Sequence, residues 1–344
     1  MGFDDVAIVG DRLFTGLADL TSDVDALDGS GTWVVVLPFD GEPVLARFDE
    51  SRPAAGWVSA VGAPATVPPV RRWASSLDRQ GFAKRVGVIR ELIAAGDVYQ
   101  VNLCRRLSAP LPPGFDVLGL GAALGSAHAA PHSAVVSLPS AGMSVASASP
   151  ERFLGRSGDA VESRPIKGTA VTAGALGPKD RAENVMIVDL VRNDLGRVCE
   201  FGSVEVPGLC ALEEHPGLVH LVSTVRGRLR PGAGWADLLA ATFPPGSVTG
   251  APKVAALQVI ADLEPVSRGL YCGAIGWVDA DRRAGDLNVA IRTFWVEDGE
   301  LHLGTGGGIT WDSDPDAEWE ETELKARRLL AVVGGTVVGG TVGP

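Results

Sequence analysis

Residues 32–48, TWVVVLPFDGEPVLARF, indicate the fold of this chain more directly than any other stretch. The two ends of the stretch, 32–37 and 43–48, are apolar runs rich in valine, a residue that favours strands. Between them lies Asp40-Gly41, a dipeptide typical of the turn in a β-hairpin. The stretch therefore predicts two antiparallel strands that follow each other along the chain.

Similar strand-like runs recur beyond this hairpin, whereas segments with helical periodicity are fewer. The strand candidates are 98–107, 134–136, 144–146, 202–206, 218–228, 274–278, 286–295 and 300–303. The helix candidates are 82–95, 182–195, 235–241, 252–263 and 315–333. The strands cluster without a regular strand–helix–strand alternation, so we expect an α+β fold with large antiparallel or mixed sheets.

Three regions are expected along the chain. A short β-rich N-terminal region, 1–75, ends just after a proline-rich segment that resembles a linker. A main domain follows over 76–333. The last residues, 334–344, repeat Gly-Gly-Thr-Val, and we expect them to form a flexible tail.

Composition excludes several classes of protein. The chain has 344 residues, of which 46% are hydrophobic and 21% charged, as expected for a globular protein. Its net charge of −12 argues against nucleic-acid and anionic-membrane partners, which need clustered Lys and Arg. No segment is apolar for long enough to span a membrane. The four cysteines lack disulfide or zinc spacing, so we expect reduced thiols in a cytoplasmic protein.

Lys167 is the first candidate for chemistry. It lies in SRPIKGT, residues 163–169, between an apolar residue and a glycine that lets a ligand approach the backbone. A lysine in such a segment is a candidate amine nucleophile or anion clamp. The alternative is a lysine at the end of a strand with its amine in water.

A set of carboxylates is the second candidate. Asp314 and Pro315 are typical of a helix start, which places Glu318 and Glu321 on one face of the first turns. A third carboxylate is available on the helix expected over 182–195, whose polar side carries Glu183 and Asp194. Together they suit a hard cation such as Mg²⁺. The alternative for Glu318 and Glu321 is that they only complement the helix dipole. The alternative for the helix over 182–195 is that its polar side faces solvent.

Residues 246–253 and 304–309 are expected to be glycine-rich loops, and neither matches the nucleotide-binding fingerprints. Both can still present backbone N–H groups to a carboxylate, because glycine permits turns and close approach. Arg292, in a strand expected over 289–294, is a candidate to point its guanidinium into the same cavity. Its alternative is a solvent-facing arginine.

Taken in order, these motifs resemble the chorismate-utilising enzymes, which include anthranilate synthase component I, aminodeoxychorismate synthase component I, isochorismate synthase and salicylate synthase. The matching segments are 149–153, 165–169, 183–196, 220–224, 247–253, 269–273, 291–293, 306–309 and 318–322. The resemblance covers about 76–333, which it identifies as a chorismate-binding catalytic domain. It implies the anthranilate synthase component I-like fold, with large, mostly antiparallel sheets and flanking helices around a central substrate cleft.

The resemblance also implies roles for individual residues. Glu183 and Glu321 would bind Mg²⁺, and Glu318 would do so directly or through water. Glu151 would be the general acid that assists departure of the ring hydroxyl, and His220 would lie near the reacting ring. The expected substrate contacts are the backbone of Gly307 and Gly308 for one carboxylate, Arg292 and Tyr271 for the enolpyruvyl carboxylate, and Ser247 or Thr249 close to the substrate.

Two positions distinguish between the members of this family. Water-using members carry a lysine where this chain has Gln100, an amide that cannot act as a general base. Aminodeoxychorismate synthases carry a lysine where this chain has Lys167, and anthranilate synthases usually carry alanine. The resemblance therefore implies a Mg²⁺-dependent aminodeoxychorismate synthase component I, with Lys167 adding to C2 of chorismate before ammonia attacks C4. The alternatives are anthranilate synthase component I and a chorismate-binding subunit with weak activity.

The partners implied by this activity are chorismate, ammonia and a separate glutamine amidotransferase subunit, in the route to 4-aminobenzoate and folate. Residues 1–75 lack the Leu-Leu-Glu-Ser-like motif with which family members bind tryptophan. Bound tryptophan is therefore not expected.

Overall fold

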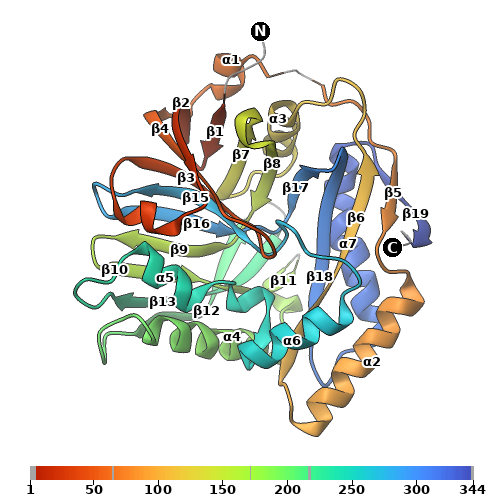
Figure 1. Cartoon of the computed structure of the whole chain (residues 1–344). Helices are drawn as coiled ribbons and strands as arrows, with labels where there is room; N and C mark the ends of the chain where they lie inside the picture. The colour runs from red at the N-terminus through yellow and green to blue at the C-terminus, as the bar shows by residue number, and fades with distance from the viewer. Residues whose placement is uncertain (1–4, 64–65, 171, 216–217, 342–344) are drawn as a thin grey trace.

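The computed structural model describes residues 5–63, 66–170, 172–215 and 218–341 of the chain. The described strands form one continuous 19-stranded hydrogen-bonded sheet, with helices packed on its outside (Figure 1). Within this described part β19 pairs with β5 in parallel, and the other strand pairs are antiparallel. The expected α+β fold with mostly antiparallel sheets is confirmed.

The strands are β1 (Val6–Val9), β2 (Arg12–Thr21), β3 (Thr32–Leu37), β4 (Val44–Pro53), β5 (Arg72–Ser75), β6 (Gln100–Pro110), β7 (His132–Leu138), β8 (Met143–Ser149), β9 (Arg152–Ser157), β10 (Ala160–Arg164), β11 (Ile166–Ala170), β12 (Glu205–His215), β13 (Leu218–Arg228), β14 (Gly250–Ala251), β15 (Ala274–Asp279), β16 (Ala284–Val289), β17 (Thr293–Glu297), β18 (Glu300–Ile309) and β19 (Thr336–Thr341). The α-helices are α1 (Trp57–Val61), α2 (Arg79–Ala95), α3 (Val117–Ala127), α4 (Pro178–Gly196), α5 (Trp235–Thr242), α6 (Lys253–Leu263) and α7 (Pro315–Val332). Short 3₁₀ turns lie at Val24–Asp28, Pro139–Ala141, Ala173–Ala175 and Gly246–Val248.

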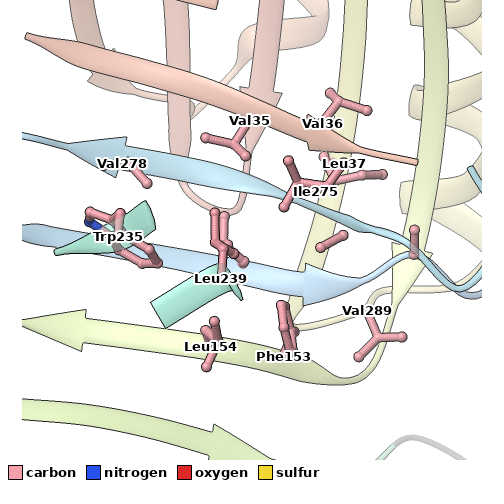
Figure 2. Packing of buried hydrophobic residues seen from close by; sticks show 14 of the residues in the cluster. Val35, Val36, Leu37, Phe153, Leu154, Trp235, Leu239, Ile275, Val278 and Val289 are labelled. Carbon is pink, nitrogen blue, oxygen red and sulfur yellow. The ribbon is translucent and has the colours of Figure 1, made fainter. Parts of the chain in front are cut away.

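The hairpin expected from residues 32–48 is present as β3 and β4, with Val35 opposite Leu45. On its other side β3 pairs with β15, so that Val34, Val35 and Val36 are fully buried. Figure 2 shows this core, in which side chains of β3 and β15 lie near those of α5 and β9. The valine run therefore places the hairpin inside the sheet rather than at its edge.

The N-terminal region, 1–75, is β-rich as expected, and its described strands belong to the same sheet as the rest of the chain. β1 pairs with β7, and β3 pairs with β15. Asp28 also accepts hydrogen bonds from the backbone N–H groups of Trp235 (2.6 Å) and Ala236 (3.0 Å) at the start of α5. The N-terminal residues thus complete the main body of the protein.

The single strand expected over 286–295 is wrong, because the chain breaks between β16 and β17. β16 pairs with β15 and β9, whereas β17 pairs with β8 and β18. The residues between them redirect the chain from one set of neighbours to the other. Arg292 lies at this break with a positive φ of 52°, an uncommon conformation for a residue with a side chain.

Two glycine-rich segments also differ from expectation. Residues 304–309 are part of β18 rather than a loop, and they pair residue by residue with β6. Residues 336–341 form β19 beside β5, although we expected a flexible tail. Their Thr-Val-Val sequence favours a strand, and the edge of β5 offers unpaired backbone groups. Residues 342–344 lie outside the described part.

Helix α3 is missing from the sequence prediction. Its glycines lower helix propensity, which concealed it. Gly121 is needed for packing, because a β-carbon there would lie 2.2 Å from a methyl carbon of Val135. The four cysteines are buried and free, as expected. None of the helices in the described residues is both long and apolar enough to cross a membrane.

Candidate functional site

Most of the expected site residues lie on elements that converge at one end of β18. Lys167 is on β11, Gln100 is at the start of β6, and Gly307 and Gly308 are near the end of β18. Glu151 lies in the short connection between β8 and β9. The remaining carboxylates come from α4, which carries Glu183, and from the first turns of α7, which carries Glu318 and Glu321.

Lys167 and Gln100 lie over the same glycine. A β-carbon added to Gly308 would lie 2.3 Å from Gln100 Nε2 and 3.4 Å from Lys167 Nζ. Only glycine therefore leaves room for both side chains on this face of the strand. Gln100 is 1% exposed, and its carbonyl oxygen has no hydrogen-bond partner among the described residues. A buried acceptor without a partner points to a ligand or water at this position.

The surroundings of Lys167 lower its pKa. Burial is the main cause, because it disfavours the charged amine. Glu183, Glu151 and Glu321 oppose this effect through their negative charges, and the result is still a lowered pKa. A larger fraction of the amine is then neutral and available as a nucleophile.

Glu151 is placed to act as an acid near neutral pH. It is 4% exposed, and burial raises its pKa to about 7. Hydrogen bonds from the Ser247 hydroxyl and the Ile166 backbone N–H lower its pKa, as do the charges of Lys167 and Arg292, but burial prevails. Near pH 7 about half of this carboxyl group carries the proton that a leaving group needs.

The three glutamates from α4 and α7 form an acidic cluster. Burial raises the pKa of Glu183 and Glu318, and mutual repulsion within the cluster raises it further. Glu318 accepts a hydrogen bond of 2.6 Å from the Ser313 hydroxyl. Glu321 is about half exposed, and its pKa is lowered chiefly by Lys325.

Two lysines that we did not predict lie among these carboxylates. Lys325 Nζ is 2.7 Å from Glu321 and donates a hydrogen bond of 2.9 Å to the carbonyl oxygen of Gly306. Lys179 Nζ is 3.8 Å from Glu183 and 3.7 Å from Glu318. Each is four residues from a glutamate on its own helix, and this spacing was the signal that could have identified them.

The acidic cluster fits a hard divalent cation in its donor chemistry, because its three side chains are all carboxylates. Buried carboxylates that raise one another's pKa would be stabilised by such a charge. In the described ranges, however, no three His, Cys, Asp or Glu side chains converge closely enough to hold a metal ion. Lys179 and Lys325 instead compensate part of the negative charge.

Gly307 and Gly308 point to opposite sides of β18. A β-carbon on Gly307 would lie 3.2 Å from Glu318 Oε2 and 4.0 Å from Lys325 Nζ. The same atom on Gly308 would face Gln100 and Lys167. The backbone of this glycine pair therefore lies between the acidic cluster and the lysine amine, which is where we expect a substrate carboxylate.

Ser247, Thr249 and His220 differ in how close they come to the reacting groups. Ser247 contacts Glu151, as described above. The Thr249 hydroxyl donates within its own turn, to the carbonyl oxygens of Pro245 (3.2 Å) and Gly246 (3.3 Å), so its visible role is structural. His220 is 2% exposed on β13, opposite Thr169 of β11, two residues beyond Lys167.

Tyr271 and Arg292 come from segments that lie side by side, because the backbone N–H of Cys272 donates a hydrogen bond of 3.0 Å to the carbonyl oxygen of Ala290. Arg292 influences the pKa of Glu151 and therefore lies near the acid. The Tyr271 ring packs over Gly304, four residues from Gly308 along the strand. At about 3.3 Å per residue this separation is about 13 Å. The charged groups that act on the Tyr271 hydroxyl are Arg268 and Glu264, neither of which belongs to the group around Lys167.

Glu151 and Ser247 line one small pocket. Its polar lining also includes Ser163, Asp194 and Thr242, and the rest is mainly apolar. Beside it, the site combines a half-protonated acid, an amine with a lowered pKa and a carboxylate cluster suited to a cation. Such an arrangement can bind an anionic molecule and replace one of its hydroxyl groups.

The chain is similar to known proteins over most of its length. Residues 50–331 match the family model described as chorismate binding enzyme. Aminodeoxychorismate synthase component 1 of Klebsiella aerogenes is 40% identical over 322 residues, which are 89% of this chain and 70% of that protein. An anthranilate synthase component 1 of Haloarcula marismortui is also 40% identical, over 83% of this chain and 60% of that protein.

Solved structures show the same fold. Anthranilate synthase component I from Streptococcus pneumoniae superposes with a TM-score of 0.77 at 22% identity, covering 96% of this chain and 93% of that one. The menaquinone-specific isochorismate synthase from Escherichia coli also gives a TM-score of 0.77, at 20% identity and with 96% and 88% coverage. The sequence relatives and these structures carry different activities, so similarity alone does not select one reaction.

Proposed function

Because the chain belongs to the chorismate-binding enzyme family, we propose that it converts chorismate and ammonia to 4-amino-4-deoxychorismate. The observation that carries this proposal is the position of Lys167. Its amine lies beside Gln100 at Gly308, within the electrostatic influence of Glu151, and burial lowers its pKa. A neutral amine next to a proton donor suits covalent catalysis at an allylic carbon.

In the first step the lone pair of the Lys167 amine forms a bond to C2 of chorismate. The conjugated double bonds shift toward C4, and the bond between C4 and its hydroxyl oxygen breaks. Glu151 gives its proton to that oxygen, which leaves as water, and Glu151 becomes a carboxylate. The lowered pKa of Lys167 and the raised pKa of Glu151 both favour the protonation states that this step needs.

In the second step ammonia forms a bond to C4, the double bonds shift back, and the bond between C2 and the Lys167 nitrogen breaks. The lysine recovers its lone pair, and the new amine loses a proton to the Glu151 carboxylate, which restores the acid. The sum is chorismate and ammonia to aminodeoxychorismate and water. Gln100 cannot deprotonate water, which supports ammonia as the nucleophile.

We assign Glu183, Glu318 and Glu321 as the residues that would hold Mg²⁺, which would neutralise a substrate carboxylate when bound. Lys325, between Glu321 and Gly306, is placed to contribute positive charge to the same substrate group. The ammonia would come from a glutamine amidotransferase subunit, and the product would serve the route to 4-aminobenzoate and folate in the cytoplasm.

Product identification tests this proposal. Purified protein is incubated with chorismate, Mg²⁺ and an ammonium salt, and the products are separated by chromatography. We expect aminodeoxychorismate as the main product. Anthranilate with pyruvate would instead support the second candidate, which the 40% identity to an anthranilate synthase favours. Binding of chorismate without turnover would contradict both.

A further inference from the structure

The loop of residues 243–249, which we call the acid loop, presents Ser247 to Glu151. It connects the end of α5 to β14 and contains the 3₁₀ turn Gly246–Val248. Pro245, Gly246 and Ser247 line the same small pocket as Glu151. Gly246 also packs closely on α4, because a β-carbon there would lie 2.8 Å from a methyl carbon of Leu190.

A buried ion pair supports the acid loop where it leaves α5. Lys253 Nζ is 2.6 Å from a carboxylate oxygen of Asp194 and donates hydrogen bonds of 2.9 Å to the carbonyl oxygens of Thr242 and Pro244. The Lys253 side chain is 13% exposed and that of Asp194 is 6% exposed. Its ammonium group has three hydrogens, so the three contacts satisfy it fully.

A second buried ion pair holds the other end of the loop. Arg268 is 2.7 Å from Glu264 and donates hydrogen bonds to the carbonyl oxygens of Val248 (2.8 Å) and Asn102 (2.9 Å). It thus joins the loop to β6, the strand that begins with Gln100. Between these two anchors the turn is closed by a hydrogen bond of 3.2 Å from the Val248 backbone N–H to the Pro245 carbonyl oxygen, and Ser247 contacts Glu151.

We propose that Lys253 and Asp194 are a positioning pair that holds the acid loop at the distance from which Ser247 reaches Glu151. Asp194 belongs to α4, the helix that also carries Glu183, so the pair ties the loop to the helix of the acidic cluster. The inference rests on the proposed role of Glu151 as the acid.

A purely structural ion pair would affect stability alone, whereas a positioning pair would also affect the pKa of the Glu151 carboxyl. Lys167 and Arg292 act on Glu151 through their charges, Asp194 lines the same pocket, and the Ser247 hydrogen bond lowers the pKa of the Glu151 carboxyl. Losing that bond raises this pKa. Activity requires the protonated acid, so the decline of kcat at high pH should move to still higher pH.

The experiment compares Lys253→Met, Ser247→Ala and the double variant, with Lys253→Arg as the conservative replacement. We expect Lys253→Met and Ser247→Ala each to move the high-pH decline upward by about one pH unit. Lys253→Met should also lower kcat by about tenfold with little change in KM for chorismate. The double variant should show no further shift, and Lys253→Arg should recover part of the loss.

Val36→Ala provides the control for stability, because Val36 is fully buried on β3 and belongs to a different part of the core. We expect it to lower the melting temperature without moving the pH profile. An unmoved profile and kcat in Lys253→Met, with a melting temperature lowered as in the control, would overturn the positioning role. Each assay follows consumption of chorismate, so the result holds whichever product forms, and product analysis tests the proposed function separately.

Discussion

The lysines in the two halves of the site have different surroundings. On the side of α4 and α7, Lys179 pairs with Glu183 and Glu318. Lys325 pairs with Glu321 and donates a hydrogen bond to the carbonyl oxygen of Gly306. On the side of β11, the described residues give Lys167 no ion pair, and burial lowers its pKa. Surroundings, rather than residue type, therefore separate a lysine that forms ion pairs from one whose pKa is lowered by burial.

The largest effect is expected from removal of the Lys167 amine. We expect Lys167→Ala to lower formation of aminodeoxychorismate by about 10⁴-fold, because the covalent route is lost. Lys167→Arg should be similarly inactive, since a guanidinium stays charged. Product formation is measured by chromatography, and a trapped adduct by mass spectrometry of the intact protein.

The control for this prediction is Lys84→Ala, which removes an exposed lysine on α2. It should retain full activity. Full activity in Lys167→Ala would contradict the covalent role and would leave only the family assignment in place.

The acidic half is tested next, with two neighbouring glutamates on α7. Glu321→Gln should lower activity by about 10³-fold and raise the Mg²⁺ concentration needed for half-maximal rate, because a charged ligand is lost. Glu320→Gln is the matched control, since Glu320 is 58% exposed and pairs with Arg79. Magnesium titrations of both variants give the comparison, and equal behaviour would remove Glu321 from the metal site.

Glu151→Gln should lower activity by about 10²-fold, the usual contribution of a general acid. In the wild-type protein, activity should fall as the pH rises through about 7, because the acid loses its proton there. Glu151→Gln should lack this decline. A pH–rate profile of both proteins checks the prediction, and an unchanged decline in the variant would assign it to another group.

Replacement of Glu151 should lower activity but raise the free energy of unfolding at high pH. Its folded pKa of about 7 lies above its ordinary value of 4.5, so folding favours the protonated form. The stability that this form contributes is present below pH 4.5 and is lost as the pH rises through about 7. Glu151→Gln should therefore be more stable than wild type at pH 8, by about 1–3 kcal/mol, in urea unfolding. A less stable variant at that pH would contradict this account.

The sequence was sufficient for the elements that follow a local rule. The valine-rich hairpin, the helix that starts at Asp314-Pro315 and the strand over 218–228 all appear as expected. Local patterns gave the wrong secondary structure where tertiary contacts determine it. Glycines concealed α3 and suggested a loop at 304–309, although at Gly304 and Gly308 they only make room for Tyr271, Gln100 and Lys167.

In the site, too, local patterns predicted some features and tertiary contacts decided others. The carboxylates and Lys167 could be identified from motifs, because each motif keeps its residue types in order. Whether two motifs meet depends on strand pairing and chain direction, which the sequence does not state locally. Arg292 illustrates this limit, since its strand is interrupted where β16 gives way to β17. The spacing of four residues to a glutamate could have identified Lys179 and Lys325, but their contacts with Glu318 and Gly306 depend on how the elements pack.

Gln100 is the neutral neighbour of Lys167 at Gly308. Gln100→Met should lower activity by about tenfold, since the amide that lies beside the Lys167 amine is lost. It should not reduce stability, because the buried carbonyl oxygen has no partner to lose. Steady-state kinetics and thermal unfolding measure the two effects. A marked loss of stability would show that the amide serves the fold.

The smallest effect is expected from Tyr271, which the family resemblance places at the enolpyruvyl carboxylate. Its ring packs over Gly304, and the cavity that it lines contains Arg105, Glu264 and Arg268 rather than Lys167. Tyr271→Phe should therefore change KM for chorismate by less than about threefold, with kcat unchanged.

Arg292→Gln provides the contrast, because Arg292 lies near Glu151 and can meet a substrate carboxylate. We expect it to raise KM by at least about tenfold. Initial rates over a range of chorismate concentrations compare the two variants. If Tyr271→Phe raised KM as much as Arg292→Gln, the substrate would have to extend along β18 as far as Gly304. The separation between the lysine half of the site and the Tyr271 cavity would then be wrong.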